Sequence, residues 1–280
     1  MQANIRSYAK INLALNVIKK ISNFHKIESI VSFISLHDEI LIKRIISKNH
    51  IIFFTGKFSK NIGKINTVSN LLSILDNKKL LKNKKFKIKI KKNIPVQAGL
   101  GGGSMNAASI LNYLIKKKIV RINQKQIVDI CKLVGSDVVL GLNSTNTIIN
   151  YKDGIKRFAN DKKIYTLIVK PTIGCSTKRV YSKLRKFNKP KFNKPNKLMF
   201  NLNFLKKMTN SLEPIVFSMH RKLKNIKFFL ERSTCAEFVR MTGSGSALVA
   251  YFYSKEKCDN AKRHFNKKYK NYWCISSKTI

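Results

Sequence analysis

Residues 95–108 combine a proline, four glycines and a run of small residues, and they read Pro95-Val96-Gln97-Ala98-Gly99-Leu100-Gly101-Gly102-Gly103-Ser104-Met105-Asn106-Ala107-Ala108. Glycines leave backbone N–H groups free of side-chain crowding. A helix that starts here adds its N-terminal amides and the positive end of its dipole. We therefore predict a cradle for phosphate oxygens, with Ser104 as the helix N-cap and within reach of a phosphate or its magnesium ion. No Gly-Lys-Ser/Thr follows, so the segment is not a Walker A loop.

The sequence around this segment predicts strands before it and helices after it. Alternating or β-branched patterns predict strands over residues 4–18, 27–46 and 85–92, the last with isoleucines on one face and lysines on the other. Apolar residues spaced three and four apart predict amphipathic helices over residues 104–115 and 124–134. Strands followed by helices on one face indicate an α+β layered fold.

The second half of the chain is predicted to form a separate layer. Strands are predicted over residues 164–169 and 247–253. Between them, residues 186–195 repeat Lys-Phe-Asn-Lys-Pro twice, and two prolines without apolar periodicity predict an exposed loop. We place the domains at 1–155 and 156–280.

Composition limits the class of protein. The chain has 280 residues, 44% of them hydrophobic, and no uninterrupted apolar run of about 18 residues. The beginning of the chain has no apolar signal-peptide core. The five cysteines form no C-x-x-C pair, which favours reduced, buried thiols over a disulfide framework or a zinc site. We expect a cytoplasmic protein that does not enter a membrane.

The net charge of +44 has two explanations. Basic charge gives salt-dependent affinity for nucleic acid or another polyanion. Alternatively, the lysines are compositional, because lysine, asparagine and isoleucine share A/T-rich codons and are abundant throughout the chain. We do not expect nucleic acid to be the main partner, and such a field would also steer a phosphate-rich substrate to the protein.

Three motifs in order resemble the signatures of the GHMP kinases (galactokinase, homoserine kinase, mevalonate kinase and their relatives). The first is Ala9–Leu13, the second is Pro95–Ala108 and the third is Met241–Ala247. The resemblance implies a two-domain GHMP kinase fold, with an N-terminal domain like domain 2 of ribosomal protein S5 and a C-terminal ferredoxin-like α/β sandwich. It also implies ATP and Mg²⁺ as cofactors. The sequence shows no dedicated carboxylate cage for Mg²⁺, so we expect no magnesium ligands from protein carboxylates.

Further motifs resemble the branch of this family that phosphorylates the 2-hydroxyl of 4-diphosphocytidyl-2-C-methyl-D-erythritol in isoprenoid precursor biosynthesis. They are Ala9–Leu15, an aromatic-His pair at Phe24-His25, the Gly-x-Asp-Val at 135–138 and the Ser-Thr-x-x-Val-Tyr at 176–181. The implied partner is a small molecule that carries cytidine diphosphate, and the implied assembly is a monomer or a homodimer.

The resemblance assigns catalytic roles to Lys10 and Asp137. Asp137 would take the proton from the substrate hydroxyl. Lys10 would lie beside it, keep the carboxylate ionised and stabilise developing negative charge. Asn12 would bind substrate or fix this pair.

The remaining assignments concern binding. Two aromatic rings can sandwich a pyrimidine, and the residues implied at the cytidine are Phe24, His25 and Tyr181. Residues 95–105 and Asn66 are implied at ATP. The third motif, with Gly243, Ser244 and Gly245, would shape and close the phosphate loop.

The chain departs from the family pattern at three of these positions, and two alternatives stay open. Met105 replaces a serine, Val139 replaces a proline and Phe24 replaces the usual tyrosine. One alternative is a GHMP kinase of the homoserine or mevalonate type. The other is a catalytically dead, basic relative that binds RNA or another polyanion.

Overall fold

The computed structural model describes the chain except for residues 1, 23, 61, 153 and 161–162, and its residues form two compact units. Unit 1 comprises residues 1–9, 36–96 and 101–144, and unit 2 comprises residues 10–35, 97–100 and 145–280. Two long strands, β1 (Gln2–Ile21) and β2 (Phe24–Ile45), run through both units. The units are not continuous in sequence, so the boundary near residue 155 stays a prediction.

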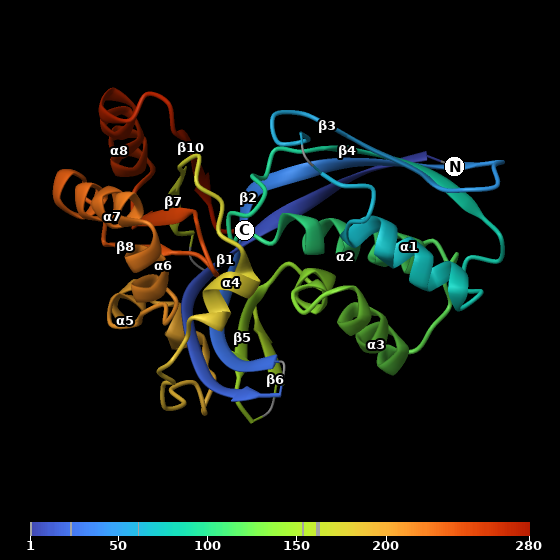
Figure 1. Cartoon of the computed structure of the whole chain (residues 1–280), viewed down its shortest axis with the longest axis horizontal. Helices are drawn as coiled ribbons and strands as arrows, with labels where there is room; N and C mark the ends of the chain where they lie inside the picture. Colours follow the sequence, from blue (N-terminus) through green and yellow to red (C-terminus); the bar gives the residue numbers. More distant parts are fainter. Residues whose placement is uncertain (1, 23, 61, 153, 161–162) are drawn as a thin grey trace. The chain divides into compact units, whose positions relative to one another are not determined.

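Unit 1 is a sheet with helices on one face (Figure 1). Its elements are β3 (Ile51–Thr55), α1 (Thr67–Asn77), β4 (Lys85–Lys91), α2 (Gly102–Lys116), α3 (Gln124–Val134) and the short 3₁₀ helix η1 (Val138–Leu142). β4 pairs antiparallel with β2 and parallel with β3. The core contains Phe86, Ile88 and Ile90 from β4, packed against leucines of α1 and α2. The predicted alternation of β4 and the predicted helices are confirmed, and Gly135 ends α3 as its C-cap.

Unit 2 contains the second sheet, whose strand order is β10-β7-β9-β8. Its elements are β5 (Asn146–Asn150), β6 (Gly154–Phe158), β7 (Tyr165–Lys170), α4 (Thr177–Ser182), η2 (Lys197–Phe200), α5 (Leu202–Lys206), α6 (Glu213–Met219), α7 (Arg221–Ser233), β8 (Phe238–Met241), β9 (Leu248–Phe252), α8 (Lys255–Lys268) and β10 (Trp273–Lys278). β5 pairs with the first part of β2 and with β6. The strands predicted over 164–169 and 247–253 are confirmed.

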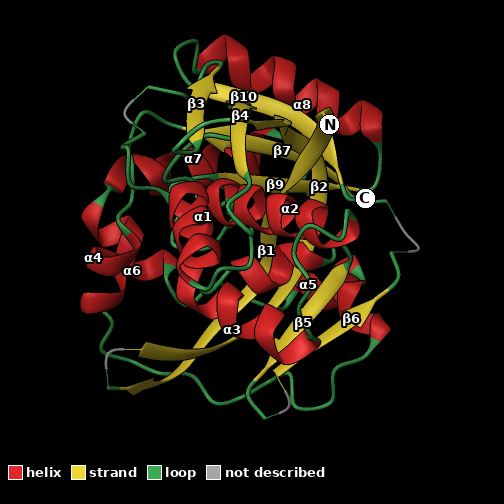
Figure 2. Ribbon diagram, turned by 90° about the vertical axis from the view of Figure 1, so that its right-hand side faces the viewer, coloured by secondary structure: helices red, strands yellow, loops and turns green. Residues whose placement is uncertain are grey.

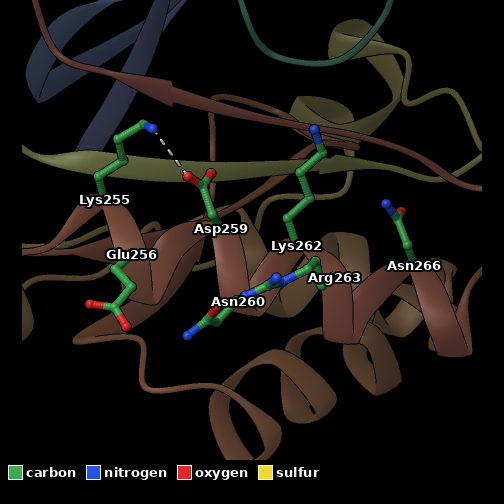
Figure 3. Close-up of a pocket in the computed structure, with 7 residues that line it drawn as sticks. All are labelled: Lys255, Glu256, Asp259, Asn260, Lys262, Arg263 and Asn266. Carbon is green, nitrogen blue, oxygen red and sulfur yellow. Dashed lines mark hydrogen bonds and ion pairs between the residues drawn. The ribbon is translucent and has the colours of Figure 1, made fainter.

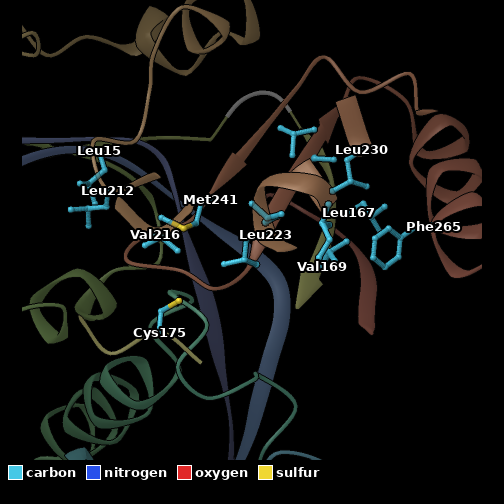
Figure 4. Packing of buried hydrophobic residues seen from close by; sticks show 14 of the residues in the cluster. Leu15, Leu167, Val169, Cys175, Leu212, Val216, Leu223, Leu230, Met241 and Phe265 are labelled. Carbon is cyan, nitrogen blue, oxygen red and sulfur yellow. The ribbon is translucent and has the colours of Figure 1, made fainter. Parts of the chain in front are cut away.

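The core of unit 2 forms between its sheet and its helices (Figure 4). Leu167 and Val169 of β7 face Leu223 and Leu230 of α7 and Phe265 of α8. α8 packs against β7, β9 and β10, and it lies next to β10 in the view coloured by secondary structure (Figure 2). In both units, therefore, apolar helix stripes cover one face of a sheet, as an α+β fold requires. No helix in the described part of the chain has the length and apolar character needed to cross a membrane.

Two expectations about burial were wrong. The part of β1 from Ala9 to Ile18 is buried at every position rather than on one face. Leu15 and Val17 pack in the core of unit 2, while Asn12, at an alternate position, is buried in hydrogen bonds to Lys10 and Ser29. The loop at 186–195 has no regular structure, as predicted, yet Phe192 within it is fully buried. This loop is therefore partly packed into unit 2 rather than fully solvated.

Candidate active site

The N-terminus of α2 is built from glycines. Gly101 is its N-cap, with a left-handed φ of +70°, and no side chain caps the helix. Ser104 was expected to be the N-cap, and this was wrong, because Gly101 can take the left-handed turn and the helix then begins at Gly102. The first amides of an uncapped helix lack intrahelical partners. They are therefore suited to bind phosphate oxygens.

The start of α1 packs directly on this helix start. A Cβ placed on Gly103 would lie 2.9 Å from the Thr67 Oγ1 atom, so no larger residue fits there without a shift. Asn66 is the N-cap of α1, and its side-chain oxygen accepts from the backbone N–H groups of Val68 and Ser69. The starts of α1 and α2 therefore converge within unit 1.

The turn that carries Asp137 also lies beside the start of α2. A Cβ on Gly135 would be 3.9 Å from the Ser104 Oγ atom, and Gly141 packs against Met105. Asp137 is half-buried and directly precedes η1, but its side chain does not cap that helix. A capping role therefore does not explain this aspartate.

A buried ion pair supports the other side of the glycine segment. Lys92 donates to the carboxylate of Asp38, and both side chains are almost fully buried. The same carboxylate accepts from the backbone N–H groups of Asn93 and Ile94, at 2.8 Å each, and from the Asn106 amide at 3.0 Å. A Cβ on Gly102 would be 3.2 Å from the Lys92 Nζ atom, so this ammonium lies against the start of α2.

The sequence motifs do not predict Lys92 or Asp38. Their positions along the strands nevertheless point to both, because alternate residues of a strand face the same side. Lys92 continues the buried series of Phe86, Ile88 and Ile90, and Asp38 precedes the buried Ile40 and Ile42 at the same spacing. A charged residue in register with a buried face needs a partner. These two meet because Glu39, next to Asp38, pairs with Lys91 across the antiparallel strands.

Unit 1 also contains a cavity of about 500 Å³ beside the start of α1. Its lining is a mixture of apolar and polar side chains, among them Ile52, Phe54, Asn66, Ser69 and Leu72. A flat heteroaromatic ring fits such a surface, because the apolar groups contact its faces and the polar groups its edge.

Within unit 2, the glycine segment is tied to the third motif. The backbone N–H groups of Ser246 and Ala247 donate to the carbonyls of Gln97 and Ala98, and the Thr242 hydroxyl donates to the Gly99 carbonyl at 3.1 Å. Gly99 has a φ of +74°, and a Cβ on it would lie 2.0 Å from the Thr242 carbonyl oxygen. Only glycine fits at that position.

The third motif has its own internal support. It links β8 to β9 through Gly243 and Gly245, which have left-handed φ values of +54° and +81°. The hydroxyls of Ser244 and Thr177 lie 2.8 Å apart, which ties the motif to the start of α4.

The first motif joins the same network. The Lys10 backbone N–H donates to the Leu100 carbonyl, and the Lys10 ammonium donates to the Asn12 side-chain oxygen at 2.6 Å. The Asn12 side-chain amide donates to the Ser29 hydroxyl, and the Asn12 backbone N–H donates to the Thr242 hydroxyl. Lys10 is therefore held by Asn12 in a buried position.

An aromatic group lies elsewhere in unit 2. The His25 ring centroid is 4.8 Å from that of Tyr181 and 6.4 Å from that of Phe187. Partial burial, and then nearby Lys20, lower the pKa of His25 from its usual 6.5, so the ring is neutral near pH 7. Phe24, at the beginning of β2, is 79% exposed.

The predicted residues thus fall into two sets. The starts of α1 and α2 and the Asp137 turn belong to unit 1, while Lys10, Asn12, the third motif and the aromatic group belong to unit 2. The pairing of Lys10 with Asp137 stays a prediction. A shallow surface concavity on α8, lined by residues such as Lys255, Asp259 and Arg263, contains none of the predicted residues (Figure 3).

Comparison with known proteins defines the class first. Residues 66–150 match the GHMP kinases N terminal domain, and residues 184–271 match the GHMP kinases C terminal domain. A crystal structure of 4-(cytidine 5'-diphospho)-2C-methyl-D-erythritol kinase superposes with a TM-score of 0.78 at 21% identity, covering 99% of this chain and 100% of that one. A homoserine kinase from Cytophaga hutchinsonii superposes with a TM-score of 0.73 at 15% identity, covering 100% and 94%. The predicted GHMP kinase fold is confirmed.

Sequence identity then defines the branch. A 4-diphosphocytidyl-2-C-methyl-D-erythritol kinase from Pelagibacter ubique is 52% identical over 276 residues, covering 99% of this chain and 98% of the relative. Another from Clostridioides difficile is 31% identical, covering 98% and 94%. The chain therefore belongs to the 4-diphosphocytidyl-2-C-methyl-D-erythritol kinase family of GHMP kinases.

Proposed function

We propose that this protein transfers the γ-phosphate of ATP to the 2-hydroxyl of 4-diphosphocytidyl-2-C-methyl-D-erythritol, giving ADP and the 2-phosphate. The observation that carries the proposal is the 52% identity to a kinase of this name along 99% of the chain. The uncapped, glycine-rich start of α2 supports it, because phosphoryl transfer depends on positioning and on charge stabilisation.

In the proposed mechanism, the amides at the start of α2 hold the phosphates, and the cavity near Asn66 receives the adenine. Asp137 accepts the proton of the substrate 2-hydroxyl while the oxygen of that hydroxyl forms the new bond to the γ-phosphorus. The bond from that phosphorus to the β,γ-bridging oxygen breaks, and ADP leaves. Lys10, held by Asn12, stabilises the negative charge on the transferring group.

Magnesium belongs to the nucleotide in this proposal. The described residues contain no group of three or more His, Cys, Asp or Glu side chains that could hold a metal ion, and Mg²⁺ commonly binds through substrate phosphates. When bound there, Mg²⁺ neutralises phosphate charge. The Ser104 hydroxyl in the first turn of α2 is the side chain suited to contact it.

The test is a phosphoryl-transfer assay with Mg-ATP and the cytidine substrate. Asp137→Asn should lower kcat about 100- to 10,000-fold, because the general base is lost while the side-chain volume is kept. Asp129→Asn, on the exposed face of α3, is the matched control and should keep full activity. Turnover of homoserine or mevalonate instead would refute the substrate, and no turnover of any of them, with salt-resistant RNA binding, would favour a catalytically dead relative.

A further inference from the structure

The tandem repeat at 186–195 places one of its phenylalanines beside the predicted cytidine site. The Phe187 ring lies 6.4 Å from the His25 ring, with 28° between the two planes, and His25 in turn contacts Tyr181. Phe187 is 44% exposed, so part of this residue remains accessible to a ligand. The His25 ring therefore has both Tyr181 and Phe187 as aromatic neighbours.

The first copy of the repeat is fixed to strand β1. The Asn188 backbone N–H donates to the Val17 carbonyl at 2.9 Å, and its side-chain amide donates to the Ser211 hydroxyl at 2.9 Å. Ser211 is itself bonded to the Leu15 carbonyl. Because Asn188 follows Phe187 directly, these bonds determine where the Phe187 ring lies.

The second copy of the repeat is held in place by a buried side chain and by backbone hydrogen bonds. Phe192 is fully buried, and the carboxylate of Glu28, also fully buried, accepts from the backbone N–H groups of Lys191 and Phe192. The same carboxylate accepts from the Tyr151 backbone N–H. Equivalent phenylalanines in the two copies thus differ, since one is buried and the other is presented beside His25.

We infer that Phe187 is a substrate-binding residue that forms an aromatic wall of the site for the pyrimidine base. This inference rests on the proposed function of the same site. A base that meets the edge of His25 lies within reach of both Tyr181 and Phe187, because each of these rings is a neighbour of the histidine. Stacking of this kind tolerates any aromatic side chain, so tyrosine can replace phenylalanine here.

The experiment compares Phe187→Ala and Phe187→Tyr with the wild type. Phe187→Ala should raise KM for the cytidine substrate about 10-fold and leave KM for ATP unchanged. Phe187→Tyr should stay within about twofold of the wild type. Phe228→Ala is the matched control, because Phe228 is 46% exposed on α7 and should not affect either constant.

Inhibition by two fragments identifies the part of the substrate that Phe187 contacts. Phe187→Ala should weaken inhibition by CMP about 10-fold and leave inhibition by pyrophosphate unchanged, because pyrophosphate has no ring to stack. A KM for the cytidine substrate within twofold of the wild type would overturn the inference while the proposed function stands. If the wild type does not turn over this substrate, the proposed function fails, and calorimetric titration with CMP then decides whether Phe187 contacts a pyrimidine.

Discussion

Replacement of Gly99 by alanine tests whether the contact between the glycine segment and the third motif is needed for ATP binding. The new Cβ would lie 2.0 Å from the Thr242 carbonyl oxygen, and real Cβ atoms essentially never come closer than 3.0 Å to such a neighbour. The obstructing atom is backbone, so it cannot rotate away. The two segments must therefore separate by about 1 Å, which strains the bond from the Thr242 hydroxyl to the Gly99 carbonyl.

Two separate costs determine the expected magnitude. The φ of +74° at Gly99 costs alanine about 1–2 kcal/mol, and the forced shift costs about 1–3 kcal/mol more. Gly154 separates these costs. Its φ is +82°, but among the described residues other than its chain neighbours no atom lies within 4 Å of an added Cβ. Gly154→Ala should therefore lose only the backbone part. Since a misplacement of about 1 Å can reduce activity about 100-fold, Gly99→Ala should also lower kcat/KM for ATP by about that factor.

The assays are urea unfolding and steady-state kinetics on both alanine variants. We expect Gly99→Ala to be about 1–3 kcal/mol less stable than Gly154→Ala, and only Gly99→Ala to lose activity with ATP. Equal stability of the two variants, together with wild-type kinetics, would show that the segment does not depend on its contact with the third motif.

Three further predictions concern buried or half-buried side chains. Asp38→Asn should lower the free energy of unfolding by about 3–5 kcal/mol, because it leaves the buried Lys92 ammonium without a counter-charge, and an unchanged urea midpoint would contradict this. The pKa of His25 is lower in the folded protein than its unfolded value of 6.5, so its contribution to stability is fully present above pH 6.5 and is lost as the pH falls. His25→Gln should therefore flatten the fall in stability between about pH 7.5 and pH 5. Parallel stability curves for the variant and the wild type would be evidence against this. Phe192→Ala should cost about 3–5 kcal/mol in urea unfolding, whereas Phe187→Ala should cost about 0.5 kcal/mol, and similar losses would mean that the two copies do not differ.

Periodicity in the sequence was sufficient for most of the fold. The alternation in β4 and the apolar spacing in α2 and α3 are local signals, and each element was found where they indicated. The usual preference for serine at an N-cap predicts a start of α2 that is too late, because this helix begins at glycine. A helix that binds phosphate leaves its first amides uncapped, so the ordinary start signal is absent there.

The sequence alone cannot distinguish the roles of the two copies of the repeat at 186–195, because the copies have identical residues and differ only in their surroundings in the fold. Phe192 is buried by long-range contacts, and Glu28, which holds its backbone, lies 164 positions earlier in the chain. Proline content and the lack of apolar periodicity predict an exposed, irregular loop; the irregular backbone is confirmed, whereas full exposure is wrong because Phe192 is buried. The roles assigned to Lys10 and Asp137 stay predictions from the family resemblance until the variants are measured.

The placement of the acidic residues bears on the net charge of +44. The chain has thirteen acidic residues, and Glu28, Asp38 and Glu213 are buried. Each of these three accepts backbone N–H groups or an ion pair, for example Glu213 from the Met241 amide at 2.6 Å. Loss of such a carboxylate leaves buried donors unpaired and is costly, whereas surface substitutions usually change stability by less than about 0.5 kcal/mol. An excess of lysine can therefore accumulate on the surface while the buried carboxylates that support the fold are kept, as the compositional explanation requires.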